Sequence, residues 1–407
     1  MSGKISILTR PPKPGICPAP TPARRPPAAC PGAKNPPLRE NVPNPQLESI
    51  MFETFGFEET TAREVSVLFA LGIGSLFGVL AQLTRFCFRR ALVGEDRRQA
   101  AGVWAMALAV AVAGTQAAVA QGWISFAEHR LMAQDLPLLA IALGGLMFGA
   151  GMILTRGCAS RLLVLAGSGN LRALLVIAVF AITAHATLKG VLAPVRTALG
   201  AVTLPAGEQI SLAALPGGAL LWSGVIVAAA LLTALRSGNR ALTLAGAAAL
   251  GVLVPAAWVG TGYVLFDEFD PIAMESLSFT APAADTLFFV IASSSIPAGF
   301  GAGLAGGVLA GALAAAVLSG SFQWQSFESP RQTGRYLAGA VLMGTGGVLA
   351  GGCTVGAGLA GIPTLSLAAL LALAFIAVGG LAMNAALSAA SSESAARPAI
   401  PARQPAE

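Results

Sequence analysis

Three cysteines stand at the end of one repeated segment, and their thiols are the groups in this chain best suited to chemistry. The segment GSLFGVLAQLTRFC at 74–87 aligns without gaps on GLMFGAGMILTRGC at 145–158, with seven identities in fourteen positions. A third copy, AVLMGTGGVLAGGC, runs over 340–353. The shared last position is held by Cys87, Cys158 and Cys353. One position repeated three times favours a common function over incidental buried thiols.

A thiol is a weak, polarizable hydrogen-bond donor, so it holds an anion loosely. Loose sites in series suit permeation, because an ion must bind well enough to enter and weakly enough to leave. The other use of a thiol is nucleophilic, and it requires a thiolate beside a base or a cation. Cys87 and Cys158 meet that requirement best, since Arg85 and Arg156 stand two residues before them. Both uses remain open on these residues.

Arg85 and Arg156 have two interpretations. They either attract an anion to the mouth of a pathway or anchor the chain to lipid phosphate on the cytoplasmic side. Gly157 and Gly352 directly precede their cysteines and are expected to break the helices there. The short apolar stretch after each break would then begin a new helix, whose N-terminal N–H groups favour an anion. These four residues and the three cysteines are the predicted substrate-binding residues.

Composition indicates that membrane-spanning helices position these residues. The chain of 407 residues is 55% apolar and 11% charged, whereas ordinary soluble proteins have about 45–50% and about 25%. Apolar runs long enough to cross a bilayer recur at about 64–88, 99–122, 136–156, 171–193, 216–235, 241–265, 285–319, 335–352 and 364–388. The sequence therefore predicts an all-α polytopic bundle of eight or nine spans. The run 285–319 is too long for one straight span, so we expect a kink or a half-helix followed by a full one.

Loop charges predict the orientation of the spans. Alternate loops carry arginine, as at Arg97, Arg172 and Arg335, and these loops are expected in the cytoplasm. The remaining loops are acidic, above all the stretch 266–275, which is expected to be a solvated outer face. With this topology the second and third copies of the repeat cross the membrane in opposite directions. The sequence thus predicts inverted repeats with broken helices that meet at a shared site.

The predicted organisation has four parts: a tail at 1–50, a first membrane half at 51–265, a second at 266–390 and a disordered C-terminal tail at 391–407. The first tail carries +5 of the net charge of +6 and is rich in proline, so it is expected to be disordered and to be dispensable, with Met51 as an alternative start. The nearly neutral remainder argues against nucleic-acid binding. No zinc-like spacing, Walker motif, haem-ligand pair or Rossmann glycine pattern occurs, so neither a metal nor a cofactor is expected.

The segments TRFCF, LTRGCASR and GGCTVGAGLAG resemble the YeeE/YedE membrane proteins, the sulphur-transport family, over about residues 63–388. The resemblance implies Cys87, Cys158 and Cys353 as functional cysteines along a path through a helical bundle. It implies inward passage of a sulphur anion across the bacterial inner membrane, with thiosulfate as the leading substrate. Selenium compounds remain an alternative, because they are linked to some members of the family.

The expected protein is therefore a transporter or channel and not an enzyme. Its expected partners are thiosulfate or a similar anion, the lipid bilayer and, as a candidate, a small cytoplasmic sulphur-accepting protein. The alternative from another class is a membrane thiol enzyme, either a persulfide relay or a sulphurtransferase. A transporter delivers intact thiosulfate, whereas such an enzyme splits it.

Overall fold

A computed structural model describes residues 61–132, 135–205, 211–267 and 271–396, all in one compact unit. The predicted tail at 1–50 and the end of the chain at 397–407 lie outside the described residues.

The described chain is almost entirely helical, which confirms the all-α class. Its α-helices are α2 (Ala62–Thr84), α3 (Phe88–Val93), α4 (Arg97–Ala120), α5 (Leu138–Leu154), α6 (Ala159–Gly167), α7 (Leu171–Leu188), α8 (Ala193–Gly200), α9 (Gly218–Leu235), α10 (Ala241–Val259), α11 (Ala281–Ile291), α12 (Phe300–Leu318), α13 (Pro330–Leu349) and α14 (Leu367–Ala396). The short helical turns are η1 (Arg130–Met132), η2 (Leu212–Ala214), η3 (Gly260–Val264), η4 (Thr354–Gly361) and η5 (Ile362–Thr364), and the strands are β1 (Asp135–Leu136) and β2 (Leu204–Pro205). Nine helical segments of the described chain are long and apolar enough to cross a membrane, in agreement with the predicted eight or nine spans.

Local signals in the sequence explain where several helices begin. Thr61 and Glu64 form a reciprocal capping box at the start of α2. Ser329 accepts a hydrogen bond from the first turn of α13, and Pro330 follows at its first position. The long run predicted at 285–319 is divided into the short helix α11 and the full-length helix α12, so the half-helix alternative is the right one.

Glycines bring α2 and α12 into backbone contact along their length. A Cβ added at Gly74 would collide with the carbonyl group of Leu304, and one added at Gly311 with that of Ser75. The residue numbers of the contacting pairs increase in the same direction along both helices, so the two helices run parallel. Close approach through small residues is the usual way in which membrane helices associate.

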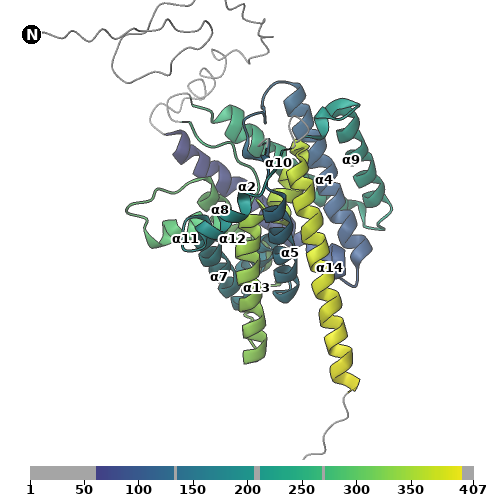
Figure 1. Ribbon diagram of the computed structural model, residues 1–407, viewed down its shortest axis with the longest axis vertical. Helices are drawn as coiled ribbons and strands as arrows, with labels where there is room; N and C mark the ends of the chain where they lie inside the picture. The colour runs from purple at the N-terminus through teal and green to yellow at the C-terminus, as the bar shows by residue number, and fades with distance from the viewer. Residues whose placement is uncertain (1–60, 133–134, 206–210, 268–270, 397–407) are drawn as a thin grey trace, which may run out of the picture. The chain divides into compact units, whose positions relative to one another are not determined.

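Helix α5 is held in the same way by two partners, α13 and α14 (Figure 1). Gly144 lies against Ala350 near one end of the α5–α13 pair, whereas Gly151 lies against Gly339 near the other. Helices α5 and α13 are therefore antiparallel, and they contain most of the second and third copies of the repeat. Helix α14, in contrast, runs parallel to α5, since Gly145 meets Phe375.

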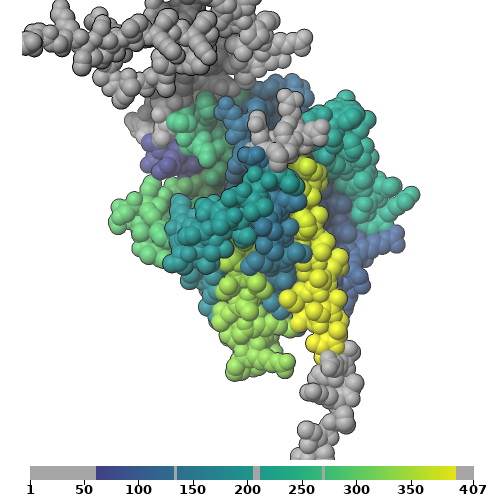
Figure 2. Space-filling model, in the orientation of Figure 1, coloured from purple at the N-terminus to yellow at the C-terminus, as the bar shows by residue number. Residues whose placement is uncertain are grey.

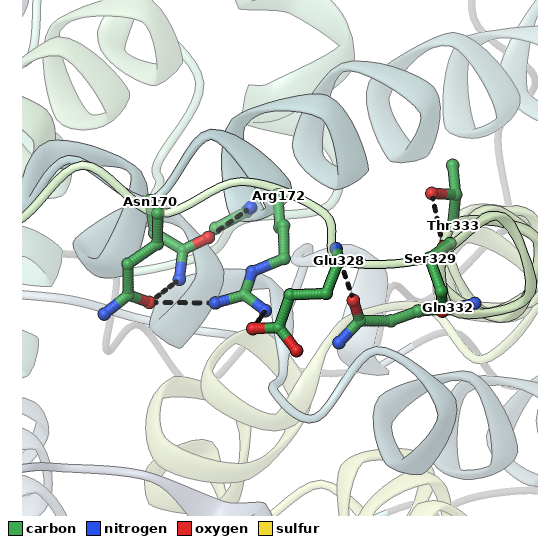
Figure 3. Close-up of polar contacts among 8 residues, drawn as sticks. Asn170, Arg172, Glu328, Ser329, Gln332 and Thr333 are labelled. Atoms are coloured by element: carbon green, nitrogen blue, oxygen red, sulfur yellow. Dashed lines mark hydrogen bonds and ion pairs between the residues drawn. The ribbon is translucent and has the colours of Figure 1, made fainter.

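The loops rich in arginine gather at one end of the bundle, which we call the arginine-rich end (residues 85–98, 168–172, 236–240 and 319–335). Arg98 donates to the carbonyl of Arg236, and Figure 3 shows Arg172 beside Glu328, at 3.6 Å. Parallel packing of α2 and α12 places their C-termini at this same end. The grouping agrees with the loop charges, while the side of the membrane that it faces stays a prediction.

The remaining loops meet at the opposite end. Strands β1 and β2 pair there, and Ser366 donates to the carbonyl of Leu131 at 2.7 Å. The acidic stretch 266–275 was expected to be fully solvated, but its last residue, Glu275, is half-buried. The backbone N–H and C=O of Glu275 both bind the Thr261 hydroxyl, at 3.0 and 2.7 Å, and these bonds draw the end of the stretch inward. Residues 268–270 lie outside the described residues.

Two predicted boundaries can be compared with the helices. The disordered C-terminal tail is predicted from 391, whereas α14 runs to Ala396. Alanine and glutamate favour a helix, and no proline interrupts it before Pro398. The two membrane halves are halves of the sequence only, since α2 packs on α12 and α5 on α13 and α14. Figure 2 shows α14, in yellow, exposed along one face, as expected of a helix that contacts lipid.

Candidate functional site

The three copies of the repeat end in the same local structure, a helix break. Two residues before the cysteine, the backbone is left-handed, with φ of 52° at Arg85, 60° at Arg156 and 77° at Gly351. In this conformation the chain leaves the helix and its last carbonyls find new donors, as when the Gly157 N–H binds Met152 at 3.1 Å. A glycine adopts this conformation freely, and an arginine adopts it at a cost of about 1–2 kcal/mol.

Each cysteine then occupies the residue before a new short helix. Cys87 precedes α3, Cys158 precedes α6 and Cys353 precedes η4, and all three are buried, reduced thiols. The Cys353 sulphur accepts a hydrogen bond from the Gly356 N–H at 3.3 Å. The Cys158 sulphur lies 3.3 Å from the Ser160 hydroxyl.

The structure brings the three cysteines near one another in the order Cys87, Cys158 and Cys353, which we call the cysteine line. Cys87 and Cys158 interact directly through their side chains. Cys158 in turn interacts with the side chain of Thr354, which follows Cys353, and with Cys353 itself. The Thr354 hydroxyl is buried and has no well-formed hydrogen bond. A buried unpaired hydroxyl is costly, so this one is free to donate to a bound anion.

Arg161, in the first turn of α6, is the cation that faces this line, and the sequence reasoning missed it. Its guanidinium interacts electrostatically with both Cys87 and Cys158 and reaches the Ala81 carbonyl at 3.5 Å. Its place in the first turn after Cys158 was the available signal, but only the fold shows that α6 also approaches Cys87.

The arginines predicted for the site lie further away. Arg85 and Arg156 are both exposed at the arginine-rich end, and the shape of their backbone forms the break. The predicted glycines lie in the breaks as well. Gly157 accepts a hydrogen bond from Thr155 at 2.9 Å through its carbonyl, and a Cβ at Gly352 would lie 2.9 Å from the Ala357 nitrogen. A side chain at Gly352 would therefore crowd the start of η4.

A cavity of about 570 Å³ opens from the opposite end of the bundle toward Cys353. Its lining includes Gly351, Gly356, Ser278, Glu275, His129 and Arg130. Gly356 also binds the Cys353 sulphur, so the cavity floor and the cysteine line share this residue. This cavity could not be predicted from local patterns, because its walls come from loops far apart in the chain.

The charges of the cavity wall are set by burial. Burial, and then the neighbouring Arg130, lower the pKa of His129 to about 4, so the imidazole is neutral near pH 7. Its Nδ1 accepts a hydrogen bond from the Leu131 N–H at 3.3 Å. Burial raises the pKa of Glu275, and the nearby Arg130 partly offsets the effect. Arg130 therefore places positive charge beside a glutamate whose pKa is raised.

The sequence matches a known transporter and a known protein family. The chain is 26% identical over 356 aligned residues to the thiosulfate transporter TsuA of Spirochaeta thermophila, an alignment that covers 76% of this chain and 96% of that protein. The family described as sulphur transport matches residues 83–382, which include all three breaks and all three cysteines. These matches confirm the resemblance read from the cysteine segments: the chain is a multi-pass membrane protein that belongs to the sulphur transport (YeeE/YedE) family.

Proposed function

We propose that this protein carries thiosulfate, or a closely related sulphur anion, inward across the bacterial inner membrane along Cys353, Cys158 and Cys87. The observation that carries the proposal is that three helix breaks bring these buried thiols near one another, with Cys158 interacting with both of the others. The transport function named for the relative from Spirochaeta thermophila supports the substrate class.

The chemistry of the line suits an anion with two unlike ends. Thiols offer soft, weak S–H donors to the terminal sulphur, while the Thr354 hydroxyl and the backbone N–H groups of η4 can bind the oxygen atoms. Arg161 offsets the negative charge near Cys87 and Cys158 without binding as tightly as a direct ion pair. Sites of this kind in series allow the ion to pass from one to the next.

The cavity at the opposite end is the proposed entrance. Arg130 attracts the anion, and Gly351 and Gly356 leave room for it to approach Cys353. The arginine-rich end is the proposed cytoplasmic exit, in keeping with the distribution of positive charge in membrane proteins. A small sulphur-accepting protein in the cytoplasm remains a proposed recipient of the ion.

The test is uptake of thiosulfate labelled differently on its two sulphur atoms, in cells that lack other importers. We expect both labels to enter in equal amounts and in the same molecule. Uptake at the background rate of cells without the protein would contradict the proposal.

The side-chain interaction between Cys87 and Cys158 supports a second candidate function, that of a membrane sulphurtransferase. There, a thiolate would attack the outer sulphur of thiosulfate, forming a cysteine persulfide and releasing sulphite. The same assay separates the two functions, because this reaction leaves one label on the protein and the other in sulphite.

A further inference from the structure

Three arginines from separate elements lie near one another at the arginine-rich end. Arg89 lies on α3, Arg156 in the α5–α6 break and Arg335 on α13. Arg89 interacts electrostatically with the other two and with Tyr336 and Cys87. The group therefore lies just beyond Cys87, on the side of the cysteine line away from the cavity.

Packing of α13 against α5 fixes this arrangement. A Cβ added at Gly339 would lie 2.7 Å from Thr155 and 2.8 Å from Leu154. Residues 335 and 336 stand one helical turn before Gly339, so they lie beside the break that contains Arg156. Tyr336 is buried and packs edge-on against Phe327, at 5.8 Å between ring centres.

Acceptors for these arginines are missing among the described residues. The two ion pairs among the described residues join Arg90 to Asp96 and Arg172 to Glu328. They leave out the three arginines of this group. The Nε atoms of Arg89 and Arg335 are buried, and each lacks a hydrogen-bond partner. Three like charges repel one another, and buried unpaired N–H groups are unfavourable, so the arrangement is incomplete without an anion.

We propose that Arg89, Arg156, Arg335 and Tyr336 form a binding site for a tetrahedral oxyanion at the arginine-rich end. Guanidinium groups bind oxyanions through paired N–H donors, and the Tyr336 hydroxyl supplies one more. The oxyanion is either the sulfonate-like end of the transported ion on its way out or the phosphate of a lipid headgroup. Only the first of these uses rests on the proposed function.

Sulfate is the probe, because it presents the same tetrahedron of oxygen atoms without the soft sulphur. The full chain is purified in a neutral detergent, and its thermal unfolding is followed as sulfate replaces chloride at constant ionic strength. We expect sulfate to raise the unfolding temperature with saturation in the parent protein. In Arg89→Gln and Arg335→Gln the apparent dissociation constant should rise at least about fivefold, since each loses a charge-assisted bond.

Two controls separate this site from the rest of the molecule. Arg240→Gln, an exposed arginine between α9 and α10, should keep the parent response. The response to sulfate is measured without thiosulfate, so failure of the cysteine path leaves this result intact. Without sulfate, Arg335→Gln should unfold at or above the parent temperature, because repulsion is relieved; this shows that the variant is folded.

Short-chain lipids identify the source of the oxyanion. If phosphatidylglycerol, but not phosphatidylcholine, stabilises the parent and removes the response to sulfate, the site holds anionic lipid. If neither lipid does so and Arg335→Gln slows thiosulfate uptake, the site serves the transported ion. Absence of stabilisation by sulfate, or an equal response in the parent and both arginine variants, would overturn the proposal.

Discussion

The break at Cys158 and the break at Cys353 share one backbone shape but differ in their electrostatic surroundings. Cys158 lies near the hydroxyl of Ser160 and the guanidinium of Arg161. Cys353 is surrounded mainly by backbone groups, including the N–H of Gly356, and lies between Gly351 and Gly356, which line the cavity. The same backbone break thus occurs in two surroundings. The surroundings are neutral at Cys353, toward the cavity, and cationic at Cys158, toward the arginine-rich end.

If the chain carries an anion as proposed, the neutral first site would admit it without holding it strongly, and the cations beyond the second site would draw it onward. Substitutions of these residues test whether the two surroundings act on the ion differently.

The largest effect is expected from Cys158→Ala, because Cys158 stands between the other two cysteines and interacts with both. Its initial rate of thiosulfate uptake should fall at least about tenfold, as expected for loss of a hydrogen bond to a charged ligand. In Cys353→Ala the uptake rate should fall less, since the backbone donors of η4 remain. Unfolding free energy should change by about 1 kcal/mol or less in both, because little buried area is lost.

Cys17→Ala is the matched control, and it should transport like the parent. Uptake at the parental rate by Cys158→Ala and Cys353→Ala alike would remove the cysteine path.

Arg161→Gln should have the next largest effect, a fall in uptake of about fivefold, because the counter-charge near Cys87 and Cys158 is lost. Arg161→Lys keeps the positive charge but not the planar guanidinium group, so it should recover part of the lost uptake. The measurement is the concentration dependence of uptake. An unchanged half-saturating concentration in Arg161→Gln would show that the cation has no part in binding the ion.

Substitutions to glycine at the left-handed positions separate backbone from charge. Arg156→Gly and Arg85→Gly both keep the break, so the free energy of unfolding should stay within about 1 kcal/mol of the parent. Arg156→Gly should lower uptake about threefold, because Arg156 belongs to the group with Arg89 and Arg335, whereas Arg85→Gly should not. Equal uptake by the two variants would assign both arginines to the backbone and the lipid interface alone.

The smallest effect should come from pH, through Glu275 in the cavity wall. Its pKa is raised by burial, so it becomes neutral above the usual range for glutamate as pH falls. A neutral Glu275 repels the anion less, and apparent affinity should rise about twofold between about pH 8 and about pH 5. Glu275→Gln should bind with the higher affinity throughout and show no such change. A parental pH profile in this variant would exclude Glu275.

Through Glu275, folding stability also increases as pH falls. Because the folded state holds the proton of Glu275 more tightly than the unfolded state, this group destabilises the fold at neutral pH. That cost disappears as pH falls through the raised pKa.

Much of this architecture could be predicted, because apolar length and a gapless repeat are local properties of a sequence. The nine spans and the three cysteines follow from them. The left-handed position was also visible in principle: a residue that is arginine in two copies and glycine in the third suggests a demand of the backbone. It was interpreted as charge, since Arg85 and Arg156 also fit the charge of a cytoplasmic loop.

The role of Arg161 was beyond such reasoning, because it depends on α6 lying against the end of α2. The cavity was hidden for a similar reason. Its walls come from segments near residues 129, 275 and 356, which approach one another only in the folded protein.

The glycine contacts of α2 with α12 and of α5 with α13 and α14 determine which parts of the protein can move. Helices whose backbones touch cannot slide by one residue without forcing a side chain into the gap, and a hinge between the two halves of the sequence would have to separate both contacts. We therefore expect conformational change in the short helices α3, α6 and η4, which begin at the cysteines, and not between the closely packed long helices. If the chain carries an anion as proposed, local gates inside a stationary frame would accommodate it, and not two domains that rock around it.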